Sequence, residues 1–174
     1  MALEITAEIG VDTDEMLVVT YRIVGELARL RIPTDAEHLD PDRLWAHTCC
    51  ELFVAPLAGA AYVEHNFSPN GQVARFELSA YRERVPSSPV VAAASVSTAR
   101  ERGVLELCAR APLPAGTDAA RISITAVIED DAGALSYWAL RHPTDRPDFH
   151  DPDGFALALT LGAVPAIVDA PGPS

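Results

Sequence analysis

The chain has 174 residues, a formal net charge of −12 and a hydrophobic fraction of 49%. This length predicts one domain, with a core large enough to need neither a disulfide nor a metal. The negative charge repels phosphate backbones and anionic lipids, so nucleic acid and membrane surfaces are not expected partners. Every basic residue is arginine, which excludes the lysine chemistry of Schiff bases and P-loops.

The amino terminus carries acidic residues where a signal peptide would carry basic ones, and it lacks an apolar h-region. No apolar run approaches the ~20 residues that cross a bilayer, so we expect a cytoplasmic protein. The cysteines are Cys49, Cys50 and Cys108, an odd number that does not indicate a disulfide framework. Adjacent strand residues point to opposite faces, so Cys49 and Cys50 are not expected to share a metal, and reduced thiols are expected.

Short strands separated by turns account for most of the chain. Alternation predicts strands at 15–23 and 26–32, the second ending at Pro33, whose missing N–H breaks the ladder. A loop with a short helical turn is expected within 34–44. The remaining expected strands are 45–54, 61–68, 72–82, 90–98, 103–111, 121–129, 135–141 and 155–161. Turn signals at this spacing are typical of an all-β fold built as an antiparallel β-sandwich or a barrel.

The domain organisation that follows is simple. We expect one domain over residues 1–162 and an irregular C-terminal tail over residues 163–174. The proline-rich stretches at 86–89 and 112–116 are expected to be loops inside the domain, because strands resume directly on both sides.

The three central strands divide into an apolar row and a polar row. On 45–54 the even-numbered residues are expected to face the core, as is His65 on the next strand, and Ala74, Phe76 and Leu78 are expected to do the same on the third. Consecutive strands with short turns usually pair in antiparallel fashion, which would bring the polar rows onto one sheet face. That face is predicted to carry Trp45, His47, Glu51, Glu64, Asn66, Arg75 and Tyr81.

Such a mixture of groups is what sugar recognition needs. Aromatic rings stack on the C–H face of a pyranose, and carboxylates, amides and guanidinium groups bond its hydroxyls. The alternative is a solvated sheet face with cross-strand ion pairs. Trp45 favours a binding role, since an exposed tryptophan among polar residues is uncommon.

A second cluster lies at 136–150. Pro143 and Pro147 force a turn after the strand there, and loops at strand ends often carry function. The residues gathered near this strand end are Trp138, Arg141, His142, Asp148 and His150. The alternative is structural: Trp138 and Phe149 plug one end of the sandwich, and Arg141 pairs with Asp148. The pattern leaves open whether Tyr137 or Trp138 faces the core.

Three blocks, LWAHTCCELFVAP, YVEHNFSPNGQVARFELSAYR and SYWALRHPTDRPDFH, resemble the signatures of the small bacterial DOMON-like domain proteins. These belong with the superfamily of DOMON domains and family-9 carbohydrate-binding modules. The resemblance extends from about residue 10 to residue 162. It implies an immunoglobulin-like or jelly-roll sandwich of roughly ten strands, in a superfamily whose members bind sugars or haem.

The resemblance also implies roles for single residues. Sugar-binding relatives have a tryptophan followed six residues later by a glutamate on one strand, and Trp45 and Glu51 match that pair. Trp138 would stand in for a second stacking tryptophan. The haem-binding branch uses methionine and histidine ligands, whereas Met16 is the only methionine here beyond the initiator and has no histidine near it in sequence.

The reading that these observations favour is a non-catalytic domain that binds a carbohydrate or a sugar-like metabolite and needs no cofactor. The alternatives are a haem-binding module, which could use a bis-histidine site, a hydrolase of glycosidic bonds that uses Glu51 and Glu64, or an interaction domain for another protein. A zinc site built from three histidines is a further alternative, with His47, His142 and His150 as ligands.

Overall fold

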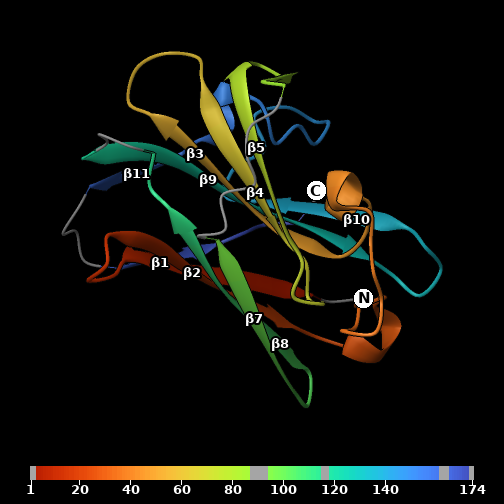
Figure 1. Ribbon diagram of the computed structural model, residues 1–174. Helices are drawn as coiled ribbons and strands as arrows, with labels where there is room; N and C mark the ends of the chain where they lie inside the picture. The colour runs from red at the N-terminus through yellow and green to blue at the C-terminus, as the bar shows by residue number, and fades with distance from the viewer. Residues whose placement is uncertain (1–2, 87–93, 115–117, 161–164, 173–174) are drawn as a thin grey trace.

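The computed structural model describes residues 3–86, 94–114, 118–160 and 165–172. Over these ranges the chain forms two antiparallel sheets that pack face to face, as Figure 1 shows. The expectation of an all-β antiparallel sandwich is therefore confirmed. No helix in the described ranges is long and apolar enough to cross a membrane.

The smaller sheet has five strands in the order β12-β1-β2-β8-β7. Their bounds are β1 Glu4–Val11, β2 Met16–Val24, β7 Ser95–Glu101, β8 Val104–Pro112 and β12 Ala166–Asp169.

The larger sheet has the order β10-β9-β3-β4-β5-β6, and β11 also pairs with β9. Its strands are β3 Cys49–Pro56, β4 Tyr62–Phe67, β5 Val73–Ala80, β6 Glu83–Arg84, β9 Ala119–Glu129, β10 Leu135–Ala139 and β11 Leu157–Thr160. Three short 3-10 helices join the strands: η1 Leu27–Arg29, η2 Pro41–Ala46 and η3 Pro152–Gly154.

The main core lies between the two sheets. Alternate residues of each central strand enter it, for example Leu17, Val19 and Ile23 from β2 and Leu52 from β3. Each such side chain contributes about 1.5–3 kcal/mol of burial free energy. A second, smaller core on the outer face of the larger sheet contains Leu39, Leu44, Cys49 and Ala74, with Phe76 packed against it. The 34–46 segment therefore folds back over that face.

Several sequence expectations need correction. Residues 26–32 do not form a strand: η1 occupies Leu27–Arg29, and Leu30 makes only an isolated bridge to Asp130. Leu27 and Leu30 are the buried residues of this segment, and their spacing of three suits a 3-10 turn rather than a strand. The strand expected at 45–54 begins only at Cys49, because η2 continues to Ala46.

Three strands were not expected from the sequence. Strand β1 alternates, with Ile5, Ala7 and Ile9 buried. Strand β6 is a two-residue partner of β5. Strand β12 lies inside the tail that was expected to be irregular, and it pairs with β1. Part of the strand expected at 90–98 lies outside the described residues, and β7 begins at Ser95.

Candidate functional site

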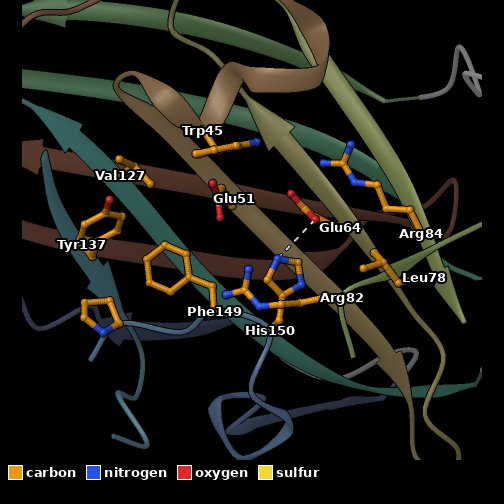
Figure 2. Close-up of a pocket in the computed structure, with 11 residues that line it drawn as sticks. Trp45, Glu51, Glu64, Leu78, Arg82, Arg84, Val127, Tyr137, Phe149 and His150 are labelled. Atoms are coloured by element: carbon orange, nitrogen blue, oxygen red, sulfur yellow. Dashed lines mark ion pairs between the residues drawn. The ribbon is translucent and has the colours of Figure 1, made fainter. Parts of the chain in front are cut away.

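A cleft of about 480 Å³ lies on the outer face of the larger sheet, the face turned away from the five-stranded sheet. Its volume is within the usual range of small-molecule sites. Figure 2 shows the side chains that line it. They are Trp45, Glu51, Glu64, Leu78, Arg82, Arg84, Val127, Tyr137, Pro147, Phe149 and His150.

Helix η2 places Trp45 at the rim of the cleft. Asp40 caps this helix by accepting a hydrogen bond from the Asp42 N–H at 3.0 Å. The preceding loop is tied to the turn before β5 by Gln72, which accepts from the Leu39 N–H at 2.7 Å and donates to the Leu39 carbonyl at 2.9 Å. Trp45 itself remains 40% exposed. A large aromatic ring is thus held open to solvent by a well-anchored loop.

The floor of the cleft contains two buried carboxyl groups. In the register of β3 and β4, Glu51 lies opposite Asn66 and Phe53 opposite Glu64, so both glutamates leave the same face of adjacent strands. Each is only 3% exposed. Thr125 donates to Glu51 at 3.2 Å, and Asn66 donates to one oxygen of Glu64 at 2.7 Å. The second oxygen of Glu64, Oε2, has no hydrogen-bond partner.

Burial raises the pKa of both carboxyls. For Glu51 burial is the largest cause, and the neighbouring Glu64 raises the pKa further, to a position well above its usual value. For Glu64 burial again dominates, while the hydrogen bond from Asn66 and the nearby Arg84 and Arg82 act in the opposite direction. Two adjacent buried carboxyls cannot readily both ionise, so the pair tends to retain a proton.

The 141–155 loop forms the wall opposite Trp45, as Figure 2 shows for Phe149 and His150. His150 Nδ1 lies 2.7 Å from the Tyr62 hydroxyl, and its Nε2 lies 3.9 Å from Glu64 Oε2. Burial, followed by the positive charge of Arg82, lowers the pKa of His150 to about 4. The imidazole is therefore neutral at pH 7, and its approach to Glu64 is not a charged pair.

Two arginines from the β5–β6 hairpin, Arg82 and Arg84, line a third side of the cleft. Arg82 has a left-handed backbone conformation, with φ of 57°, and its guanidinium pairs with Asp148 at 2.9 Å. Arg84 lies over the ring of Phe76, 3.5 Å from its centroid, and pairs with Asp42 of η2 at 3.8 Å. The hairpin thereby connects the two loops that flank the cleft.

Of the ten residues predicted for the site, the structure brings three into the cleft: Trp45, Glu51 and Glu64. Asn66 lies behind them, fully buried, and holds Glu64 in place. Trp45 reaches the cleft from η2 and not from a strand. Glu51, Glu64 and Asn66 do share one sheet face, as predicted, but they are buried on it.

The prediction that Arg75 lies on the same sheet face as Glu51 and Glu64 is wrong. In the register of β4 and β5 it lies opposite His65, whereas Phe76 lies opposite Glu64. The apolar residues of β5 therefore face the cleft side, and Arg75 faces the other side, where it pairs with Glu77 at 2.7 Å. His65 is buried as expected, but neither of its ring nitrogens has a hydrogen-bond partner.

The other predicted residues lie outside the cleft lining. His47 follows η2 and contacts Glu129 at 2.8 Å and Arg31 at 2.9 Å. Trp138 leaves the opposite face of β10 and packs against the main core. Tyr81 donates a hydrogen bond to Asp148 and so braces the 141–155 loop.

Arg141 and His142 begin that loop. Arg141 is exposed, and Asp148, its expected partner, pairs with Arg82 instead. His142 contacts the Pro171 carbonyl at 3.3 Å and lies near Phe149, with ring centroids 6.5 Å apart.

Sequence reasoning missed several lining residues that came from the second cluster. Tyr137 faces the cleft and Trp138 the core, which settles a question that alternation left open. Arg82 and Arg84 had no sequence signal, since their positions depend on the short β5–β6 turn. No group of three or more potential metal ligands occurs among the described residues, so His47, His142 and His150 do not form a metal site there.

Comparison with known proteins finds similarity among solved structures. No protein-family model matches the chain, and no curated protein matches it significantly. A solved structure, that of a "putative carbohydrate-binding protein" from Bacteroides uniformis, superimposes with a TM-score of 0.65. The match covers 92% of this chain and 79% of the other, at 18% sequence identity. At that identity the likeness shows the fold alone.

Proposed function

We propose that the chain binds a carbohydrate or a sugar-like metabolite in the cleft and performs no chemistry on it. The observation that carries this proposal is the pairing of an exposed aromatic ring, Trp45, with two carboxyl groups, Glu51 and Glu64, within one cleft. Phe149 and Tyr137 add further aromatic surface to its walls. Rings offer an apolar face to sugar C–H groups, and the carboxyls accept from sugar hydroxyls.

Two further facts support the proposal without deciding it. The fold is shared with the Bacteroides uniformis protein described as a "putative carbohydrate-binding protein". The three sequence blocks resemble DOMON-like proteins, and together those three blocks supply most of the cleft lining. We therefore also propose that the chain is a DOMON-like domain of the sugar-binding kind.

Intrinsic fluorescence tests the proposal, because Trp45 and Trp138 are the only tryptophans. A panel of monosaccharides and disaccharides is titrated into the wild type, Trp45→Phe and Trp138→Phe. We expect at least one sugar to change the emission of the wild type and of Trp138→Phe, but not that of Trp45→Phe. A response that follows Trp138, or no binding to any sugar at millimolar concentration, contradicts the proposal.

A glycoside hydrolase is the second candidate, since it also needs two carboxyl groups of which one stays protonated. Glu51 and Glu64 project from the same face of adjacent strands, so both carboxyls can reach one bound sugar, and a turnover assay separates hydrolysis from binding. Release of reducing sugar that disappears in Glu51→Gln would establish the hydrolase instead.

Haem does not fit the side chains of the cleft. His150 is the one histidine among the described lining residues, and Met16 lies on β2 of the other sheet. One ring nitrogen of His150 is bonded to Tyr62 and the other points toward Glu64. His47 is held by Glu129 and Arg31 outside the lining, so an axial pair is not assembled.

A further inference from the structure

We propose that the ligand of the cleft carries a positively charged amino group, which binds between the carboxyls of Glu51 and Glu64. An amino sugar is then the class of ligand that the site selects. This inference rests on the proposed sugar-binding function and adds the chemical feature by which the cleft would distinguish one sugar from another.

The arginines of the cleft are paired with carboxylates, whereas, among the described residues, the two glutamates on its floor are not paired with cations. Each of the two arginines has its own carboxylate: Arg82 pairs with Asp148 and Arg84 with Asp42. The two glutamates have no such compensation. Within the described part of the chain no arginine lies within ion-pair distance of either glutamate. Arg82 and Arg84 act on the charge of Glu64 only at longer range, and the one basic group within ion-pair distance of Glu64 is His150 at 3.9 Å, which is neutral. A cation is therefore what the floor of the cleft lacks.

One carboxyl oxygen of Glu64 lacks a hydrogen bond from any described residue. Glu64 is 3% exposed, and its Oε2 is buried without a partner. A buried acceptor left unpaired is destabilising, and more so where it is charged. Figure 2 shows this carboxyl beside that of Glu51, below Trp45. An ammonium group has three N–H donors, enough to reach Glu51, Glu64 Oε2 and one further acceptor.

The walls of the cleft are aromatic and would also attract a cation. Trp45, Tyr137 and Phe149 surround the floor with aromatic surface. Ring faces attract cations, and more strongly where water is excluded. The net charge of −12 adds a long-range attraction for cations and opposes anionic ligands such as sugar phosphates.

The glutamate pair should make binding depend on pH. The titratable and charged groups that act on the pair or line the floor beside it are Tyr21 on β2, Cys49 and Cys50 on β3, Tyr62 on β4, Arg82 and Arg84 on the β5–β6 hairpin, Tyr137 on β10 and His150 on the 141–155 loop. Burial raises the pKa of both carboxyls, which favours a proton on the pair, and an ammonium group bound between them would displace that proton. Binding should then release a proton and should tighten as the pH rises, until the amine itself loses its proton.

The test compares sugars that differ at one position. In the gluco, galacto and manno series, the parent sugar, its 2-amino form and its 2-acetamido form are titrated into the wild type, Glu64→Gln, Glu51→Gln and Glu106→Gln. Glu106 is exposed on β8 of the other sheet and serves as the matched control. We expect the amino form of at least one series to bind at least 10-fold more tightly than its two partners, a difference of about 1.4 kcal/mol. The preference should be lost in Glu64→Gln or Glu51→Gln and kept in Glu106→Gln.

Calorimetry in two buffers of different ionisation enthalpy supplies an independent readout. A proton should be released on binding of the amino form and not on binding of the parent sugar. If parent sugars bind as tightly as amino forms and release no proton, the charge inference is wrong while the sugar-binding proposal stands. If no member of any series binds, both are wrong. Circular dichroism of each variant establishes that it is folded.

Discussion

Replacing Glu64 with glutamine should change the pH dependence of stability in a defined direction. In the unfolded chain the carboxyls of Glu51 and Glu64 have ordinary pKa values, and in the folded protein burial raises the pKa of both, while the charge of Glu64 raises that of Glu51 further. Between these values the folded state binds more protons than the unfolded state. Stability is therefore highest at low pH with respect to this pair and falls as the pH rises.

The size of the effect follows from linkage. For each proton that the folded state holds in excess, the free energy of unfolding falls by about 1.4 kcal/mol per pH unit. In a chain of this length 1 kcal/mol shifts Tm by roughly 2–4 °C, which gives roughly 3–6 °C per pH unit for one proton. In Glu64→Gln one titrating group is gone and the repulsion on Glu51 is relieved. The contribution of the pair to the slope should fall to half or less, and the variant should be more stable than the wild type at pH 8.

Thermal unfolding from pH 4.5 to pH 8 measures this effect in the wild type, Glu64→Gln and the control Glu106→Gln. Two histidines act in the opposite direction: the pKa values of His65 and His150 are lowered to about 4 by burial, so their contribution to stability grows as the pH rises toward 6.5. They are present in every variant, and the difference between variants isolates the pair. A Glu64→Gln protein with the pH profile of the wild type, or one less stable at pH 8, refutes the account of the carboxyl pair.

Three further predictions concern single contacts, two that support the site and one in the packing of Trp138. Tyr21 donates a buried hydrogen bond of 2.6 Å to the Glu51 carbonyl, so Tyr21→Phe should lose about 1–2 kcal/mol in denaturant titrations; an unchanged midpoint would contradict this. Tyr62 bonds both His150 and the Arg82 N–H, so Tyr62→Phe should speed hydrogen exchange of the amides in 148–151 while β3 stays protected. Equal acceleration in both places would show general loss of stability instead. A Cβ on Gly172 would lie 2.8 Å from the Trp138 ring, so Gly172→Ala should shift Trp138 emission to the red and loosen β12, and an unaltered spectrum would be evidence against this packing.

The sandwich could be predicted because alternation is strong on strands such as β2 and β8, whose buried residues alternate with more exposed ones. The faces of β5 could not. Alternation separates Ala74, Phe76 and Leu78 from Arg75 and Glu77, but it does not say which row faces the other sheet. The apolar row faces outward because two smaller cores lie there: Leu39 and Leu44 of the 34–46 segment pack with Ala74, and Phe155 packs with Leu78. Such packing depends on where a loop lies in space, and the alternation of residues along a strand does not predict that.

The candidate site was predictable only in part for the same reason. Glu51 and Glu64 follow from the pairing of two consecutive strands, which sequence order and short turns already favour. His150 and Phe149 depend on how the loop after β10 returns over the sheet. That return is fixed by Asp148 bonding Arg82, a contact between residues 66 positions apart in sequence.

The most direct test of the central claim follows the two tryptophan indole N–H signals in a ¹H–¹⁵N spectrum while a sugar is added. Trp45 lines the cleft, whereas Trp138 faces the main core and donates its indole N–H to Ser136. A ligand in the cleft should move the Trp45 signal in a saturable way and leave the Trp138 signal in place. If a bound sugar moves Trp138 and leaves Trp45 unchanged, the cleft is not where it binds.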